Sequence, residues 1–264
     1  MQYLRQLERK KIMTTELLKN KLSTKAQELE AVNETSIVGT ENNYPALTEN
    51  AMDIISDNLN HQPLTFQLFD IVKSPSGGAT AFTVPGISGD EVYKELTGII
   101  IGYTTPRAYW DTPDPVEGTS PVCFSSDSII STDGKACAHC EFNTFGSKDG
   151  ESNAKACKES VVLFLLRPDN IMPIIVRIPV SSKLRFQRYL TRLIGNMLPV
   201  SSVVTKITLE KTTNKTGQPY SLYKFEAVDE LEHDDAVKAK NFGKHLLEMI
   251  QTEEIEEAIE KKAS

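Results

Sequence analysis

The segment 161-VVLFLLRPDNIMPIIVRIPVSSKLRFQRYLTRLI-194 decides the fold class of this chain. It contains two apolar runs, Val161–Arg167 and Ile174–Val180, and the Pro-Asp chemistry of Arg167–Asn170 between them is typical of a tight turn. The residues that follow, Ser181–Ile194, have helical periodicity and begin with serines that can cap a helix. The segment therefore predicts a strand, a turn, a second strand and a helix.

The sequence on either side of this segment predicts further strands. Apolar or alternating runs bounded by turn residues occur at Leu64–Val72, Ala79–Val84, Leu96–Tyr103, Val203–Lys211 and Tyr220–Val228. Asn214–Gly217 predicts the turn that joins the last two. From Leu96 onward the order is strand, cysteine-rich insertion, strand, strand, helix, strand, strand. This is the order of an OB-fold, a five-stranded Greek-key barrel whose helix lies between the third and fourth strands.

We therefore expect a mainly β protein with flanking helices, built on an OB-fold-like five-stranded barrel with a metal-binding insertion between its first and second strands. Another small β-barrel, or an α+β sheet with the same local order, is the alternative. Changes in composition and hydrophobic pattern along the chain predict three regions: a helical N-terminal extension (1–60), the barrel (61–228) with its insertion (111–159), and an acidic C-terminal helix or tail (229–264). Helices are predicted in the extension at 1–32 and Leu47–Leu59.

All four cysteines lie within 35 residues, with the spacing C-x13-C-x2-C-x16-C: Cys123, Cys137, Cys140 and Cys157. A C-x2-C turn directs two thiolates at one ion, and two more complete the tetrahedron that structural zinc prefers. The surrounding loop is polar, so we expect the metal to hold it. An iron–sulfur cluster would suit the same ligands, and His139 could replace one of them. A catalytic zinc is not expected, because four thiolates leave no open position.

The charge is distributed unevenly along the chain. From Glu226 to Ser264 there are 12 acidic and 5 basic residues, which accounts for the whole net charge of −7. Lys155–Lys224 has 12 basic residues against 3 acidic ones. A basic middle followed by an acidic end suggests a polyanion site and a tail that could dock protein partners. The alternative is solvated surface charge without a partner.

Cations and aromatic side chains of the β-rich region are candidate nucleic-acid contacts. Non-specific single-strand binding requires cations that follow the backbone and aromatic faces on which bases stack. Arginines recur along one side of the predicted helix, and lysines interrupt the apolar strands. The candidate set is Arg107, Tyr109, Trp110, Arg177, Lys183, Arg185, Arg188, Arg192, Lys206, Lys211 and Lys224. The alternative for the helix is an ordinary exposed face, which is usually charged.

Motifs of common enzymes are missing from the sequence. No G-x4-G-K-[ST], H-E-x-x-H or G-x-S-x-G occurs, and the four histidines are scattered. Asp111, Asp114 and Glu117 could serve a metal-dependent nuclease, but carboxylates spaced by prolines in a loop usually face solvent. No apolar run is long enough to span a bilayer, and the N-terminus carries no secretion signal. We therefore expect a cytoplasmic protein that is not an enzyme.

The stretch Leu96–Val228, about half of the chain, resembles a group of phage and mobile-element proteins of low-GC bacteria. The resemblance rests on the blocks AYWDTPDPVEGTSPVCFSSD, CAHCEFNTFGS, KACKES, IPVSSKLRFQRYL and VVTKITLE. In plan the chain is also similar to the T-even phage helix-destabilising protein and to the zinc-bearing barrel of the large subunit of replication protein A. This resemblance implies single-stranded DNA binding in a bacterial or phage-infected cell. The terminal Glu-Lys-Lys-Ala-Ser departs from bacterial single-strand binders, whose tips are acidic and end hydrophobically.

The sequence thus predicts a sequence-independent single-stranded DNA-binding protein of replication or recombination, with a structural zinc ion. Two alternatives stay open. One is a zinc-containing interaction or regulatory adaptor that docks partners through the cysteine loop and the terminal helices. The other is a metal-dependent nuclease.

Overall fold

The computed structural model describes residues 44–250, except for 49, 63, 74, 76, 113–120, 149–153, 169 and 215–216. The chain divides into two compact units, 1–42 and 43–264, and every described residue belongs to the second. The helix predicted at 1–32 and the tail beyond residue 250 lie outside the described residues. Within the described part, no helix combines the length and the apolar content needed to cross a bilayer.

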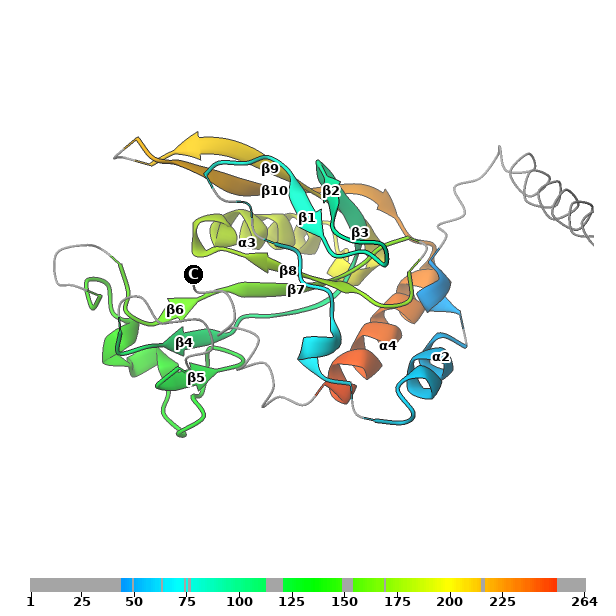
Figure 1. Ribbon diagram of the computed structural model, residues 1–264, viewed down its shortest axis with the longest axis horizontal. Helices are drawn as coiled ribbons and strands as arrows, with labels where there is room; N and C mark the ends of the chain where they lie inside the picture. Colours follow the sequence, from blue (N-terminus) through cyan, green and yellow to red (C-terminus); the bar gives the residue numbers. More distant parts are fainter. Residues whose placement is uncertain are drawn as a thin grey trace, which may run out of the picture. The chain divides into compact units, whose positions relative to one another are not determined.

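An antiparallel sheet of five strands lies at the centre of this unit (Figure 1). Its strand order is β10-β9-β3-β7-β8. The bounds are β3 (Glu95–Thr104), β7 (Val161–Leu166), β8 (Ile174–Ile178), β9 (Val203–Thr213) and β10 (Pro219–Glu230). The mainly β class with flanking helices is confirmed. None of the described sheets closes into a barrel.

Strand β7 explains why the deciding segment is so apolar. All six of its residues are buried, since β7 lies between β3 and β8 and both faces of the sheet are covered. Successive side chains alternate between the faces and enter two separate cores, one containing Val162, Phe164 and Leu166 and the other Val161, Leu163 and Leu165. A strand buried on both faces has a continuous hydrophobic sequence rather than an alternating one.

One face of the sheet packs against helix α3 (Val180–Gly195), as predicted from the helical periodicity. Phe186 of α3 lies 5.2 Å from Phe225 of β10, measured between ring centroids. The Tyr189 hydroxyl is 2.7 Å from that of Thr205 in the same buried region. A hairpin of β1 (Phe82–Val84) and β2 (Glu91–Tyr93) adds Phe82 to this core, which we call the inner core.

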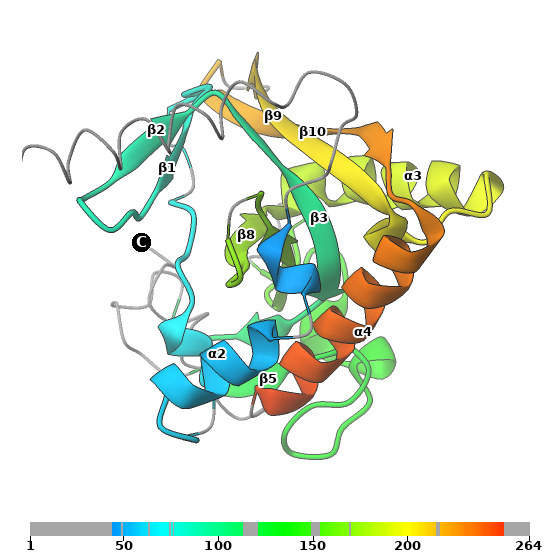
Figure 2. The same cartoon turned by 90° about the vertical axis from the view of Figure 1, so that its right-hand side faces the viewer.

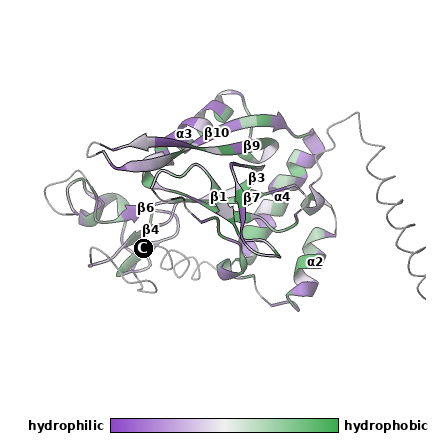
Figure 3. Ribbon diagram, turned by 45° about the horizontal axis from the view of Figure 1, so that its top comes forward, coloured by the Kyte–Doolittle hydropathy of each residue, from purple (hydrophilic) through white to green (hydrophobic). Residues whose placement is uncertain are grey.

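The opposite face of the sheet is covered by α2 (Ala51–Asn58) and α4 (His233–Met249), which form the outer core with it. α4 packs along β3, as Figure 2 shows. Both helices carry hydrophobic and hydrophilic residues, as Figure 3 shows, which is expected of helices with one face buried. The short 3-10 helices η1 (Pro45–Leu47) and η5 (Val200–Ser202) contact α4. The sequence placed these helical parts in separate regions, whereas here they share one core with the sheet.

A second sheet of three short strands, in the order β5-β4-β6, is built from the cysteine-rich insertion. Its strands are β4 (Arg107–Tyr109), β5 (Cys123–Ser125) and β6 (Lys158–Glu159). Ala108 and Phe124 lie on one face of this sheet and are buried in the outer core. The insertion is therefore attached to the rest of the unit through shared apolar packing.

Two local predictions were wrong. Leu64–Val72 is not a strand: it contains the 3-10 helix η2 (Phe66–Leu68) and a single bridge from Ile71 to Ile175. Its apolar residues cover the outer face of the sheet instead, with Phe66 and Phe69 packed edge-on against Phe164. The serines do not cap α3 either. Ser182 is buried, and its Oγ accepts a hydrogen bond from the backbone N–H of Tyr223.

Candidate metal centre

The three-stranded sheet places two of the four cysteines on one face. In the register of β4 with β5, Tyr109 is opposite Cys123, and in that of β4 with β6, Arg107 is opposite Glu159. Cys157 directly precedes β6, so extending this register sets it beside Tyr109 on the other side. Because side chains alternate in a strand, Cys123, Tyr109 and Cys157 share the face opposite to the one that enters the outer core.

The C-x2-C turn lies over this face. Cys137 begins the 3-10 helix η3 (Cys137–His139), and the backbone N–H of Cys140 donates to its carbonyl at 3.4 Å. The next 3-10 helix, η4 (Glu141–Asn143), is held from both sides. Asn143 donates from Nδ2 to the carbonyl of Cys137 at 2.8 Å, and the Phe142 ring stacks on Tyr109 with centroids 3.8 Å apart. Tyr109 thus supports the turn that carries two of the cysteines.

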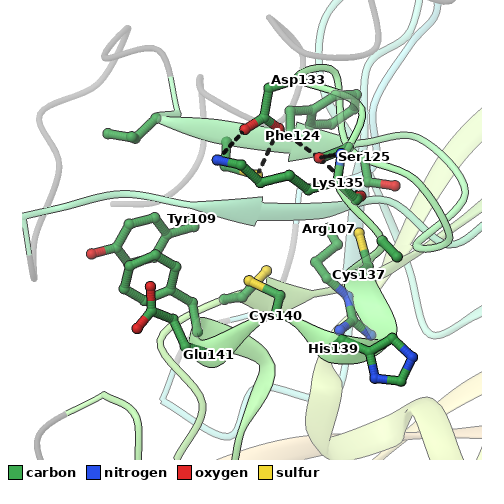
Figure 4. A pocket seen from close by; sticks show the side chains of 16 residues that line it. Arg107, Tyr109, Phe124, Ser125, Asp133, Lys135, Cys137, His139, Cys140 and Glu141 are labelled. Atoms are coloured by element: carbon green, nitrogen blue, oxygen red, sulfur yellow. Dashed lines mark hydrogen bonds and ion pairs between the residues drawn. The ribbon is translucent and has the colours of Figure 1, made fainter.

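All four cysteines line one cavity of about 620 Å³ (Figure 4). All are free thiols. Among the described residues, no three histidine, cysteine or acidic side chains stand at the spacing that holds a metal ion. The sheet gives a physical reason, because Cys123 and Cys157 are two strand spacings apart, roughly 9.5 Å between backbones. Their side chains must lean toward each other over Tyr109 to share an ion.

Burial raises the pKa of two thiols of this cavity, those of Cys123 and Cys157. The pKa of Cys157 is raised to about 12, chiefly by desolvation, while the positive charge of Arg107 acts in the opposite direction. The pKa of Cys123 is also raised, by burial and by the Asp133 carboxylate, whose Oδ1 lies 3.9 Å from the Cys123 Sγ. A bound cation would reverse this balance, because a coordinating thiol is deprotonated.

The donor set fits a thiophilic ion. Four thiols on one cavity match the ligands of structural zinc and of an iron–sulfur cluster, and soft sulfur ligands select against magnesium and calcium. His139 lines the same cavity but is exposed. The chain's own residues that would hold the ion are therefore Cys123, Cys137, Cys140 and Cys157.

Two residues that the sequence analysis did not single out connect this centre to the rest of the unit. Phe142 supports the C-x2-C turn, and Glu159 links the insertion to α3: its carboxylate accepts from Arg107 Nη2 at 2.7 Å and pairs with Lys183. The sequence gives no sign of either role, because the partners are far apart along the chain. Glu159 lies 52 residues from Arg107 and 24 from Lys183.

The structure distributes the predicted nucleic-acid residues over several environments rather than one surface. Three are largely removed from solvent: Arg107, Trp110 and Arg177. Arg185 pairs with Glu210 at 2.7 Å, and Lys224 with Glu226 at 3.7 Å. Arg188, Arg192 and Lys211 are exposed, Lys206 is partly exposed, and none of these four forms an ion pair with a described residue. Of the carboxylates considered for a nuclease, Asp111 is exposed, and Asp114 and Glu117 lie outside the described residues.

Comparison with known proteins finds no relative of this chain: no protein-family model, no curated protein and no solved structure matches it.

Proposed function

We propose that this chain is a non-enzymatic, sequence-independent single-stranded DNA-binding protein of replication or recombination, with an OB-fold-like sheet and a structural zinc ion. The observation that carries the proposal is the strand order, β10-β9-β3-β7-β8, with α3 between β8 and β9. An OB barrel opened between its third and fifth strands has this order, with the helix in the same place. OB-folds bind oligonucleotides, so the order supports the class of ligand, and individual side chains must support the site.

Residues that precede β3 contact both edges of the large sheet. The backbone N–H of Val72 donates to the carbonyl of Ile175 in β8 at 2.9 Å. At the other edge, Ser221 of β10 donates from Oγ to the carbonyl of Ala79 at 2.6 Å. Val72 therefore lies at the β8 edge and Ala79 at the β10 edge, which supports a barrel-like arrangement without direct pairing of the two strands.

The position of the proposed DNA-binding surface is inferred from which face of the large sheet is already covered by other residues. In an OB-fold the face of the second and third strands and two flanking loops contact the ligand. Here Phe66, Phe69 and Ile71 cover that face at β7 and β8. The predicted cations that are at least partly exposed and form no ion pair with a described residue lie on α3 and on the hairpin of β9 and β10: Arg188, Arg192, Lys206 and Lys211. We assign the phosphate contacts to these cations.

A smaller cavity beside the metal centre offers a second candidate surface, with basic and aromatic residues in its lining. Lys158 Nζ lies 5.7 Å from the centre of the Trp110 ring, within cation–π range. Together with Lys148 and Tyr109, these residues line a small cavity of about 190 Å³. The zinc ion would brace this surface rather than take part in chemistry.

Fluorescence anisotropy of a labelled oligo-dT tests the proposal. We expect binding at low salt and a steep loss of affinity as salt rises, because released counterions drive association with a polyanion. The variant Arg188→Ala/Arg192→Ala should bind more weakly and reduce the magnitude of the salt slope by about 0.7 for each phosphate that is no longer neutralised. Lys238→Ala/Lys244→Ala removes the same charge from α4 and should leave binding nearly unchanged.

No anisotropy change at low salt would contradict DNA binding, and cleavage of the oligonucleotide with magnesium would contradict the non-enzymatic assignment.

One observation favours the adaptor as a second candidate. Four large apolar side chains of the insertion are exposed, and two of them are adjacent in the sequence: Val122, Ile129, Ile130 and Phe145. If they dock a protein partner, Ile129→Asp/Ile130→Asp should abolish a complex that survives nuclease treatment, while the variant's zinc content stays unchanged. Loss of zinc together with the complex would indicate a damaged insertion and count against a docking role for these side chains.

A further inference from the structure

Arg107 is a buried cation with one of its donor groups unused. The residue is 9 % exposed and comes from the central strand of the small sheet. Its Nη2 donates to Glu159 at 2.7 Å and its Nε to the Ser128 hydroxyl at 3.3 Å. Its Nη1 is also buried but has no hydrogen-bond partner among the residues that the structure describes. A buried N–H without an acceptor is costly, and more so on a charged group, so this donor needs an explanation.

The guanidinium faces the cavity that the four cysteines line. Arg107 belongs to the lining of that cavity, and Figure 4 shows it among Cys137, Cys140 and His139. In the small sheet, Arg107 and Tyr109 lie on the same face, so Arg107 neighbours Cys157 diagonally across β4 and β6. The thiols that line this cavity are therefore candidate acceptors for Nη1.

An occupied metal centre would supply that acceptor. Four thiolates around a divalent ion carry a net charge of −2, and a half-buried site stabilises such a charge poorly unless donors surround it. A neutral thiol accepts hydrogen bonds weakly, whereas a metal-bound thiolate carries negative charge, and hydrogen bonds to charged groups are stronger. The unused donor is thus suited to a metal-bound thiolate rather than to a neutral thiol.

We propose that Arg107 is the outer partner of the metal centre, with its Nη1 donating to the sulfur of a metal-bound cysteine, Cys157 being the nearest in the sheet register. This inference rests on the proposed zinc site. Arg107 binds no metal itself. It offsets part of the thiolate charge and so raises the affinity of the four cysteines for the ion.

Glu159 and Lys183 hold the guanidinium in that position. The Glu159 carboxylate lies between the two cations, and all three side chains are mostly buried. Since Lys183 belongs to α3, the chain Arg107–Glu159–Lys183 connects the metal centre with the helix that carries the proposed phosphate contacts. Glu159 is a positioning residue in this arrangement, acting through Arg107.

Zinc affinity tests the inference, measured on the full chain by competition with a chromophoric chelator. Arg107→Met should raise the zinc Kd by about 10- to 100-fold, the usual cost of losing an outer partner of a metal ligand. Lys135→Met is the matched control, because Lys135 lines the same cavity but is exposed and paired with Asp133 at 2.7 Å. It should change the Kd by less than about threefold if only the Arg107 hydrogen bond matters. The rate at which an alkylating reagent modifies the zinc-loaded cysteines should rise in Arg107→Met alone.

The outcomes separate the inference from the site on which it rests. Wild-type protein that binds no zinc would overturn both. Wild-type protein that binds zinc, with Arg107→Met binding it as tightly, would overturn the role of Arg107 alone. If circular dichroism shows that Arg107→Met does not fold, Glu159→Gln decides the question: it keeps the guanidinium but loosens its anchor, and should weaken zinc binding several-fold, whereas an unchanged Kd would count against the inference.

Discussion

Arginine serves three different purposes in this chain, depending on where the backbone places it. Arg107 is buried beside thiols and a carboxylate. Arg177 is largely buried at the edge strand β8, where burial lowers the pKa of its guanidinium to about 10. Within the described part of the chain, two of its nitrogens have no hydrogen-bond partner. Arg188 is exposed on α3. The same residue type is therefore proposed to support the metal centre at Arg107 and to contact phosphate at Arg188, whereas at Arg177 it is buried at an energetic cost.

Tyr44 yields a prediction about alkaline stability. Burial and the Asp229 carboxylate raise the pKa of its phenol to about 12. In the unfolded chain the phenol ionises near pH 10, so between about pH 10 and 12 the unfolded state gains from deprotonation and the folded state does not. The contribution of Tyr44 to stability should thus be intact below pH 10 and fall as the pH rises toward 12. Urea unfolding of wild type and Tyr44→Phe over this range should show a steeper loss for wild type; parallel curves would contradict the assignment.

At the scale of elements, the contact between α4 and β3 depends on the absence of a side chain. A Cβ atom added at Gly243 of α4 would lie 2.1 Å from the carbonyl oxygen of Ile101 in β3. The helix backbone therefore approaches the strand backbone more closely than any other residue allows. At Gly102 the corresponding obstacle is the flexible end of Leu247, which can move.

We expect Gly243→Ala to destabilise the protein by about 1–3 kcal/mol, because α4 must move away from β3 to relieve the overlap. Gly195→Ala is the control: Gly195 is the last residue of α3, and an added Cβ meets nothing within 4 Å. That substitution should be neutral or stabilise by up to about 1 kcal/mol, since alanine loses less backbone entropy on folding. Free energies of unfolding from urea titration compare the two, and equal values would show that the close approach does not matter.

At the scale of the whole unit, one sheet supports two cores and the cysteine-rich insertion shares one of them. The inner core is formed between the sheet and α3. The outer core includes residues of α2, of α4 and of the face of the small sheet that carries Ala108 and Phe124. The thiols lie on the other face of that small sheet, away from the apolar packing. The metal centre should therefore stabilise the insertion locally, and the large sheet should not depend on it.

Removing the ion tests this separation. A chelator should increase amide exchange in the insertion, around Cys137 and Cys140, and leave β7 protected, because β7 is buried in both cores. Binding to oligo-dT should weaken without being abolished. Cys140→Ser should reproduce both effects in the absence of chelator. Complete unfolding on chelation, or unchanged DNA affinity, would contradict the placement of the ion as a brace for the insertion.

Much of the central sheet could be predicted because its signals are local. Strands β3, β7, β8, β9 and β10 and helix α3 each have their own periodicity and turn residues, and the structure contains all of them close to the predicted positions. The 64–72 segment was wrongly predicted as a strand, because apolar residues that cover a sheet look like those of a strand. The short strands β4, β5 and β6 have no periodicity long enough to detect.

The sequence by itself determined which segments form the strands of the large sheet and grouped the four cysteines, because both depend on near neighbours in the chain. Which of these strands pair was decided by the tertiary structure, since Glu95 of β3 lies opposite Thr208 of β9 and Ile99 opposite Leu166 of β7. Only the tertiary structure decided that the outer face of β7 is covered, that Arg107 is buried and that Glu159 joins it to α3. These features depend on residues far apart in the sequence, and the burial of each depends on every segment that packs around it. Local sequence patterns do not predict such contacts. The four cysteines of the candidate site could therefore be identified from the sequence, but the residues that surround them could not.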